Sequence, residues 1–372
     1  MSTKVIATKV IVCCGSGGVG KTTSSAALAL ALARSGRRVA VLTIDPARRL
    51  ADSLGLESLG NEPQAVPLER LGEDSGGALD AMMLDMKATW DSLVDRFSES
   101  PEARDRILGN RYYRFASTRL AGSHEYMAME RLYELVESGR YEVVLLDTPP
   151  TRHAIEFLKA PARIAGLFDE GVMHWLSLPK DSRGFRALER GSEVVVKVLK
   201  RLIGKGTIGE IAEFFDAMQG LWDTLRERGQ AVETLLASQD TRFLLVTTPA
   251  PAARAEAREF RRLLEEQGMP LGGFLVNRVV PAPEHPDALD LELFPDPPEG
   301  FEESEWREIC QGVAQAPTLQ ARLALSEQQS LRELAGEGVR TWHIPELADD
   351  VHSLQGLAEI ASYLGEAVAE LS

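Results

Sequence analysis

The segment over residues 15–22, Gly-Ser-Gly-Gly-Val-Gly-Lys-Thr, constrains this chain more than any other because it satisfies the pattern G-x-x-x-x-G-K-[ST] in full. An apolar run over residues 10–14 precedes it, and a helical pattern over residues 24–34 follows it. Glycines let the backbone wrap a phosphate group with its N–H groups, and the N-terminus of the following helix adds the positive end of its dipole. The sequence therefore predicts a strand, a phosphate-binding loop and a helix, rather than a glycine-rich turn without a ligand.

The residue types in this loop predict ATP and Mg²⁺ as its ligands. Lys21 would reach the β and γ phosphates, and the hydroxyl of Thr22 is placed to ligate the metal ion. The remaining contacts between the loop and the nucleotide are expected from Gly17, Gly18, Val19, Gly20 and Thr23.

Seven short apolar runs predict buried strands, and helical periods lie between them. Several of these runs are continuous and β-branched rather than alternating, as expected where both faces of a parallel sheet are covered. The alternation of strand and helix predicts an α/β fold with a doubly wound, mostly parallel sheet of the P-loop NTPase kind. The expected strands cover residues 10–14, 39–44, 81–84, 143–146, 243–247, 274–276 and 342–344.

One stretch, residues 152–238, contains no strand candidate and is helical in pattern throughout. Apolar residues recur there at spacings of three and four between Ile208 and Leu236, which predicts a helical subdomain inserted between two strands of the core. We therefore expect a first part of the core at residues 1–151, a helical insertion at 152–240 and a second part of the core at 241–372. Within the last part, residues 281–302 are rich in Pro, Asp and Glu and predict a mobile acidic loop.

The chain is acidic, with 56 Asp and Glu against 41 Lys and Arg and a formal net charge of −15. Binding to nucleic acid depends on neutralising phosphates, and binding to anionic lipid also needs positive charge, so both partners are disfavoured. No run approaches the roughly 18 consecutive apolar residues of a membrane-spanning helix, and the start of the chain is interpreted as a first strand rather than a signal peptide. Three cysteines without metal-ligand spacing fit a reducing cytoplasm and predict no zinc site.

Five segments give the chain its resemblance to a known family. Residues 17–23, Gly-Gly-Val-Gly-Lys-Thr-Thr, are similar to the deviant Walker A loop of dimeric ATPases. Residues 43–48, Thr-Ile-Asp-Pro-Ala-Arg, and 147–153, Asp-Thr-Pro-Pro-Thr-Arg-His, resemble the first and second switches of the arsenite-pump and guided-entry ATPases. Residues 276–278 and 344–347 resemble the adenine-binding segments of that family. The motifs run in the family's order over almost the whole chain, and the bacterial single-copy type is the most similar.

The resemblance implies roles for four further residues. Asp45 matches the switch aspartate that positions the attacking water, and Asp147 stands where a Walker B aspartate would join Thr22 in holding Mg²⁺. A carboxylate at the carboxyl end of a parallel strand does face the ligand crevice. Asn277 would pair with adenine, and Pro345 would pack on its ring. The simpler alternatives are a helix N-cap for each aspartate, a turn residue for Asn277 and a strand terminator for Pro345.

Three positions depart from the family pattern. Ser16 stands where the family's second lysine reaches across a dimer, while Arg48 and Arg152 stand at switch positions that the family leaves uncharged or weakly basic. Either arginine could supply the cation that stabilises the transferred phosphoryl group in the transition state. The alternative is that both are surface residues and the enzyme is slow. No counterpart of the pump's cysteine trio is present, so metalloid binding is not expected.

The resemblance implies a cytoplasmic Mg²⁺-dependent ATPase whose nucleotide state switches a homodimer, or a heterodimer with a paralogue. The switch would control a helical surface for a hydrophobic protein client, although the apolar stripe between Ile208 and Leu236 equally fits simple helix packing. Two other functions stay open. A partition- or septum-type ATPase would need a basic patch, yet the expected last helix, residues 354–371, contains no Lys or Arg. An ATP-gated scaffold with little hydrolysis is favoured by Ser16 and opposed by Asp45.

Overall fold

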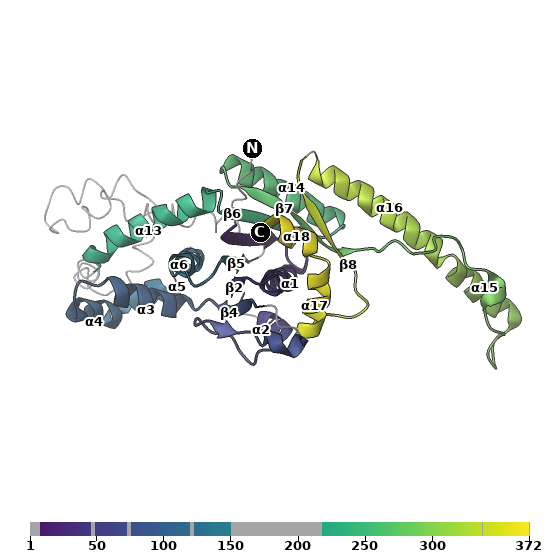
Figure 1. Cartoon of the computed structure of the whole chain (residues 1–372), viewed down its shortest axis with the longest axis horizontal. Helices are drawn as coiled ribbons and strands as arrows, with labels where there is room; N and C mark the ends of the chain where they lie inside the picture. The colour runs from purple at the N-terminus through teal and green to yellow at the C-terminus, as the bar shows by residue number, and fades with distance from the viewer. Residues whose placement is uncertain are drawn as a thin grey trace, which may run out of the picture.

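An eight-stranded sheet runs through the centre of the protein in a computed structural model that describes residues 8–45, 49–72, 76–119, 123–149, 218–336 and 338–371. The strands lie in the order β3-β4-β2-β5-β1-β6-β7-β8, and all neighbours are parallel except β3 and β4 (Figure 1). Because β5 lies between β1 and β2, the carboxyl ends of these three strands meet at one edge of the sheet. The strands are β1 Val10–Gly15, β2 Arg38–Thr43, β3 Gln64–Ala65, β4 Ala78–Met83, β5 Val143–Asp147, β6 Thr241–Thr247, β7 Leu271–Val279 and β8 Thr341–Pro345.

Helices cover both faces of this sheet. On one face α1, α17 and α18 pack together, and on the other lie α6, α13, α14 and the C-terminal end of α16. The fold is therefore the α/β, doubly wound arrangement that the sequence predicts. The helices are α1 Lys21–Arg34, α2 Arg49–Leu54, α3 Met86–Phe97, α4 Pro101–Gly109, α5 Arg111–Arg119, α6 Ser123–Glu137, α13 Gln219–Ala237, α14 Pro251–Glu266, α15 Glu303–Ala314, α16 Ala316–Ala335, α17 Leu354–Ser362 and α18 Gly365–Leu371, with short 3₁₀ turns η1 Leu68–Leu71 and η2 Leu291–Leu293.

The central strand β1 shows why its sequence is apolar without alternation. Val12 and Cys14 point into the core on the α6 side, whereas Ile11 and Cys13 point into the core beneath α1. All four side chains are fully buried. A strand covered on both faces has no polar side, so the continuous apolar run is the expected pattern.

Two details differ from the sequence prediction. The edge strand β3 is not predicted, because it has only two residues and both are exposed, which leaves no hydrophobic pattern to detect. The single helix expected over residues 354–371 is wrong: the chain forms α17 and α18, with a break at Tyr363 and Leu364. Leu364 is fully buried in the core beneath α1, as are apolar residues of both helices, so the apolar periodicity runs through the break without revealing it.

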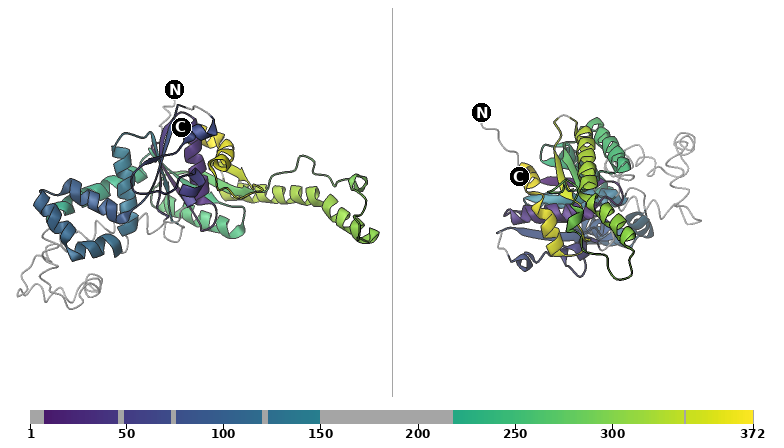
Figure 2. Two further views of the ribbon diagram at one scale, coloured as in Figure 1. Left: turned by 90° about the horizontal axis from the view of Figure 1, so that it is seen from below. Right: turned by 90° about the vertical axis from the view of Figure 1, so that its right-hand side faces the viewer.

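Two structures project from the body in opposite directions (Figures 1 and 2). Helices α3 to α6 and α13 form a helical lobe on one side, and α15 with α16 extends away on the other. The helical interpretation of the insertion can be followed only in α13, since residues 150–217 lie outside the described residues. The predicted stripe continues there, and five of its described side chains are at most 2% exposed where α13 packs on α3, α6 and β6. These buried residues are Met218, Leu221, Leu225, Val232 and Leu236. These five residues of the stripe therefore pack inside the protein.

The acidic segment, residues 281–302, lies along α15 and α16 and is tied to them by hydrogen bonds. The backbone N–H of Leu289 donates to Ala314 O at 2.9 Å, and the indole N–H of Trp306 donates to Pro295 O at 2.8 Å. The hydroxyl of Thr318 donates to Pro286 O at 3.1 Å. The segment thus follows a defined path, with one 3₁₀ turn at η2.

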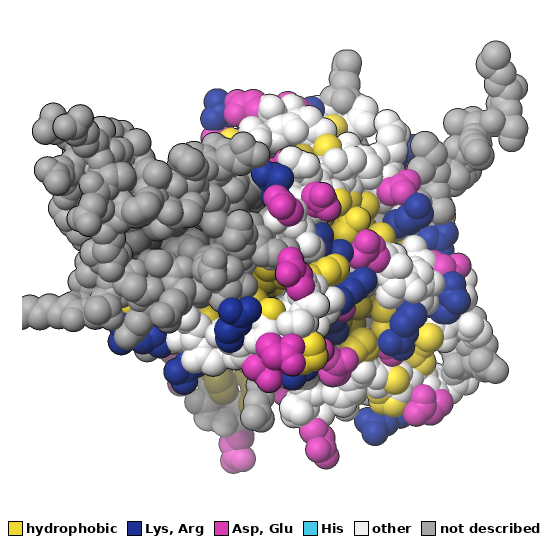
Figure 3. All heavy atoms as spheres, turned by 90° about the vertical axis from the view of Figure 1, so that its left-hand side faces the viewer, with side chains coloured by type: hydrophobic (Ala, Val, Ile, Leu, Met, Phe, Trp, Pro, Cys, Tyr) yellow, Lys and Arg dark blue, Asp and Glu magenta, His cyan; other side chains and the backbone are white. Residues whose placement is uncertain are grey.

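The two charge signs are mixed over the end of the molecule shown in Figure 3. Lys and Arg side chains stand among Asp and Glu side chains there, with apolar atoms between them, in the part of that face that described residues form. No helix within the described ranges is long and apolar enough to cross a membrane.

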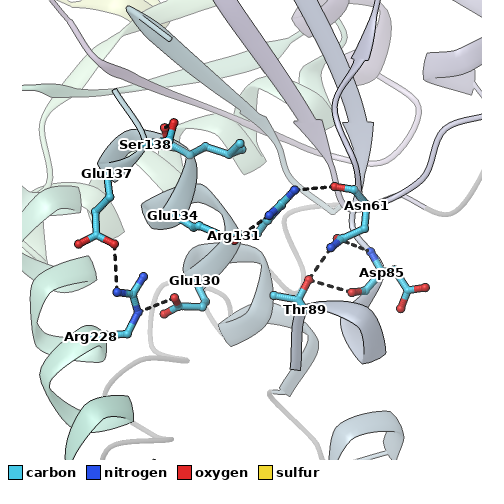
Figure 4. A network of polar contacts seen from close by, with 10 residues as sticks. Asn61, Asp85, Thr89, Glu130, Arg131, Glu134, Glu137, Ser138 and Arg228 are labelled. Atoms are coloured by element: carbon cyan, nitrogen blue, oxygen red, sulfur yellow. Dashed lines mark hydrogen bonds and ion pairs between the residues drawn. The ribbon is translucent and has the colours of Figure 1, made fainter. Parts of the chain in front are cut away.

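A buried ion cluster fastens α13 to α6 (Figure 4). The guanidinium of Arg228, on α13, donates to the Glu130 carboxylate at 2.6 Å and to the Glu137 carboxylate at 3.0 Å, both on α6. It also stacks over the rings of Phe97 and Tyr133. Glu130 is 2% exposed, and its burial raises its pKa, while Arg228 opposes that rise. The buried Glu130 carboxylate therefore depends on the Arg228 guanidinium to remain charged.

The neighbouring residue on α6, Arg131, connects the same helix to the start of α3. Its guanidinium donates to Asn61 O at 2.7 Å, and the side-chain oxygen of Asn61 accepts from the Asp85 N–H and the Thr89 hydroxyl (Figure 4). Asp85 in turn caps α3 by accepting from the Ala88 N–H at 2.9 Å. The lobe is thus linked by polar contacts to the loop between α2 and β3.

Replacing Arg228 with Leu should destabilise the protein by about 3–5 kcal/mol, because Glu130 would remain buried without its cation. Urea unfolding gives the change in free energy. The matched control is Arg226→Leu on the same helix, whose exposed pair with Asp223 should be worth at most about 1 kcal/mol. The double variant Glu130→Leu/Arg228→Leu should recover most of the loss. If Arg228→Leu costs no more than Arg226→Leu, the cluster does not hold the lobe.

Candidate functional site

The loop between β1 and α1 has a backbone that glycine alone tolerates. Gly20 lies immediately before α1 with φ 86° and ψ 26°, in the left-handed region. A Cβ atom at this position would lie 2.2 Å from the side-chain nitrogen of Asn277, and one at Gly15 would lie 2.2 Å from Val246 O. The close packing of the loop against β6 and β7 therefore requires glycine at positions 15 and 20.

The loop is exposed to solvent at Gly17 and Gly18, just before the start of α1. Val19 is 4% exposed and packs in the core beneath α1, whereas Gly17 and Gly18 are exposed at the rim. Among the described residues, no side chain caps the first turn of α1. Uncapped N–H groups and the positive end of the helix dipole attract an anion, so this geometry suits a phosphate group.

Lys21 is the cation of the loop. It is 8% exposed, and its ammonium donates to Ser16 O at 3.2 Å, so the side chain folds back over the loop. Burial lowers the pKa of Lys21, and the carboxylates of Asp147 and Asp45 oppose that effect. The Lys21 ammonium is therefore close enough to the carboxylates of Asp147 and Asp45 to interact with both electrostatically.

Asp147 connects the three central strands at their carboxyl ends. It ends β5, where it lies opposite Cys13 of β1 and Thr43 of β2. Its Oδ2 atom accepts from the hydroxyl of Thr22 at 2.8 Å and from the hydroxyl of Thr43 at 3.0 Å. Its Oδ1 atom is buried and has no hydrogen-bond partner among the described residues. This carboxylate oxygen lies beside the phosphate loop and has the chemistry of a cation ligand.

A magnesium ion fits these donors. Burial raises the pKa of Asp147 to about 6, and the hydroxyls of Thr22 and Thr43 oppose the rise. Mg²⁺ binds proteins through one or two carboxylates and takes its other ligands from water and phosphates. Within the described ranges no group of three or more His, Cys, Asp or Glu side chains could hold a metal ion.

Asp45 lies just beyond β2, beside the same edge of the sheet. Its backbone N–H donates to the Thr43 hydroxyl at 3.2 Å, and the residue is half-buried. The three residues after it are outside the described part of the chain, and so is Arg152. The structure therefore brings Asp45 to the site and leaves the roles of Arg48 and Arg152 as predictions.

Asn277 and Pro345 come to the same region from β7 and β8. The amide nitrogen of Asn277 donates to Val19 O at 3.0 Å, and its oxygen accepts from the Arg278 N–H at 3.0 Å. Pro345 is half-buried at the end of β8, opposite Val279. Asn277 thus supports the phosphate loop directly. Because an amide has two hydrogens and its oxygen two lone pairs, each end keeps capacity for one further bond.

Two threonines in the site were given no role by the sequence reasoning. Thr43 holds Asp147, and Thr148 donates its hydroxyl to Cys13 O at 2.8 Å, which locks the end of β5 to β1. Both stand at strand ends within the switch motifs. The carboxyl ends of neighbouring parallel strands share one edge of the sheet. A hydroxyl residue at such a strand end could therefore have been predicted to bond to a neighbouring strand end.

Comparison with known proteins gives the family. The model of a family described as anion-transporting ATPases matches residues 8–292. A protein of Aquifex aeolicus assigned as arsenical pump-driving ATPase 1 is 26% identical over 293 residues, which cover 73% of this chain and 64% of that protein. ATPase GET3 of Malassezia globosa is 33% identical over 154 residues, covering 41% of this chain and 43% of that protein. ATPase GET3 of Ajellomyces dermatitidis is 29% identical over 212 residues, covering 55% of this chain and 59% of that protein. The match thus spans less than two thirds of the length of each of these relatives.

The raised pKa of Asp147 predicts how stability depends on pH in the metal-free and nucleotide-free protein. The carboxyl group titrates near 4 in the unfolded chain and at about 6 in the fold, so the fold favours the protonated form. That contribution is complete below about pH 4 and is lost as the pH rises through 6. Relative to Asp147→Asn, the wild-type protein should therefore lose about 1–3 kcal/mol of unfolding free energy between pH 4.5 and 7.5. Urea unfolding with a chelator measures this difference, and a difference that stays constant with pH would contradict the assignment.

Proposed function

Because this chain belongs to the anion-transporting ATPase family, we propose that it binds ATP together with Mg²⁺ at the β1–α1 loop and hydrolyses it to ADP and phosphate. The observation that carries the proposal is the Asp147 carboxylate, which is buried, bonded to Thr22 through one oxygen and unpartnered at the other. Buried ionisable groups with a perturbed pKa are concentrated at functional sites, and a metal–nucleotide site accounts for this carboxylate beside the phosphate loop.

The chain's own residues would divide the chemistry between them. Lys21 and the N-terminus of α1 would hold the β and γ phosphates, and Thr22 and Asp147 would hold the metal ion. Bound Mg²⁺ supplies positive charge that neutralises the phosphate oxygens as the terminal bond breaks. Asp45, at the mouth of the site, would orient the attacking water and accept its proton.

The transition state also requires a second cation. The β1–α1 loop supplies only one, Lys21. Ser16 occupies the position of the family's second lysine, and its carbonyl accepts from Lys21. We therefore retain Arg48 and Arg152, which adjoin the two switch motifs, as the proposed source of that charge, in the same subunit or across a dimer. Their single and double replacement by Ala separates this role from that of a surface residue.

A second candidate function is an ATP-gated scaffold that binds the nucleotide and scarcely hydrolyses it. The uncharged Ser16 favours it, because the family's cross-dimer cation is then absent from the loop. Asp45 beside the site opposes it. Partition- or septum-type function loses support, since the family match is to anion-transporting ATPases and α17 and α18 contain no Lys or Arg.

Nucleotide-driven dimerisation and client binding remain parts of the proposal that rest on the resemblance. The partner would be a second copy or a paralogue, and the client would be a hydrophobic protein. Leu221, Leu225, Val232 and Leu236 of α13 are buried where the helix packs on α3, α6 and β6, so a client surface would have to use other residues of the predicted insertion.

Replacement of Asp45 by Asn should lower the rate of phosphate release by roughly 10²-fold or more while ATP affinity stays within a few-fold, because a general base acts on the water and not on the nucleotide. Steady-state phosphate release and calorimetric titration measure the two quantities. Asp52→Asn, an exposed residue of α2, is the matched control and should change neither.

Lys21→Ala completes the comparison. It should weaken ATP binding by roughly ten- to a hundredfold, since it removes a charge-assisted phosphate contact of about 1.5–3 kcal/mol.

Equal losses of binding and turnover in Asp45→Asn would instead assign Asp45 a structural role. Wild-type protein that binds ATP and releases no phosphate above background would favour the scaffold.

A further inference from the structure

Exposed apolar side chains gather on one projecting part of the molecule. Among the described residues eleven large apolar side chains are exposed, and nine of them lie between residues 289 and 325. This region belongs to the arm, defined as residues 281–329, which comprises the acidic segment, α15 and the first part of α16 (Figures 1 and 2). Single apolar residues are normal on a surface, but such a concentration marks an interaction site. The nine are Leu289, Leu291, Leu293, Phe301, Ile309, Val313, Leu319, Leu323 and Leu325.

The spacing of these residues on the helices suits a helical partner. Ile309 and Val313 are four residues apart on α15, and Leu319 and Leu323 are four apart on α16. Residues four apart share one face of a helix, so each pair forms an apolar ridge, with exposures between 46% and 58%. The buried residues of α15 are Cys310 and Ala314, and neither belongs to a ridge. The ridges are therefore not needed for the arm's own packing, and ridges of this kind pack against another helix.

The charge of the arm selects the partner's chemistry. Residues 284–308 carry ten acidic side chains and one arginine, a net charge of −9 in a chain whose total is −15. All ten acidic residues are exposed. Two such arms would repel each other, and nucleic acid or anionic lipid would be repelled as well. A segment that places Lys and Arg beside apolar residues complements both features of the surface.

The arm is also held in one shape before any partner arrives. Besides the bonds that tie the acidic segment to α15 and α16, the Val280 N–H donates to the Glu327 carboxylate at 2.9 Å at the base of the arm. Arg254 of α14 donates to Ser330 O at 3.3 Å, and Leu331 and Leu334 are buried in the main core. A surface that is already ordered loses little conformational entropy on binding.

We propose that the arm docks a basic amphipathic helix of a partner protein. The apolar face of that helix lies on the ridges of α15 and α16, and its flanking Lys and Arg side chains face the carboxylates of residues 284–308. This docking is independent of ATP hydrolysis at the β1–α1 loop, so it stands or falls separately from the proposed enzymatic function.

Fluorescence anisotropy tests the proposal with the full chain and a labelled 18-residue peptide of Leu and Lys patterned as an amphipathic helix. A peptide of the same pattern with Glu in place of Lys should not bind. Leu319→Ala/Leu323→Ala and Glu292→Lys/Glu299→Lys should each weaken binding of the Lys peptide at least tenfold. All four residues are exposed, and circular dichroism and thermal unfolding show whether the variants stay folded.

Two control variants separate specific docking from attraction to an acidic protein. Phe115→Ala/Tyr363→Ala removes the two large apolar side chains that are exposed outside the arm in the described part of the chain, and Glu57→Lys/Glu62→Lys makes the same charge change elsewhere; both should leave affinity within about twofold. Equal weakening by arm and control variants would overturn the proposal. So would sedimentation showing that the apolar arm variant alone converts a self-associated wild-type protein to monomers, since the ridges would then bind a second copy.

Discussion

The Asp147 carboxylate is the interaction on which the arrangement of the site depends. It stands at the end of β5, between β1 and β2, and one of its oxygens accepts from Thr22 of α1 and Thr43 of β2. Removing it from water is expensive, as its raised pKa indicates, and the two hydroxyls offset only part of that cost. A fold that holds a carboxyl group in this way is prepared for a cation at the remaining oxygen.

The chain order explains how a small set of strand ends gathers the whole site. Because β5 is inserted between β1 and β2, the phosphate loop, Asp45 and Asp147 leave the sheet side by side. On the other side of β1, β6 and β7 bring Asn277 against the loop. The chain then leaves the sheet to form the arm before it returns as β8 with Pro345. In the chain, the arm thus lies between Asn277 and Pro345, the two predicted contacts of the nucleotide base. The lobe is held together by the bond from Arg228 of α13 to α6.

Much of this could be predicted from the sequence, for physical reasons. Continuous apolar runs identified all seven longer strands, and the glycine motif located the loop, because both patterns are local. The resemblance of the two switch motifs identified Asp45 and Asp147, and their place directly after buried strands agrees with a ligand crevice at the carboxyl ends of the sheet. What could not be predicted depends on packing between distant segments: the role of Thr43, the bond from Asn277 to Val19 and the break at Leu364. The burial of the α13 stripe belongs here too, because periodicity alone does not distinguish a core face from a docking face.

Calorimetric titration of ATP with and without Mg²⁺, in the wild-type protein and in Asp147→Asn, tests the central claim most directly. If the unpartnered oxygen of Asp147 is a metal ligand, Mg²⁺ should strengthen ATP binding to the wild-type protein at least tenfold, a gain of about 1.4 kcal/mol or more. The variant should bind ATP in the absence of Mg²⁺ about as well as the wild type and show little of that gain. An equal Mg²⁺ effect in both proteins would show that Asp147 serves only to join the strands, and would contradict the account.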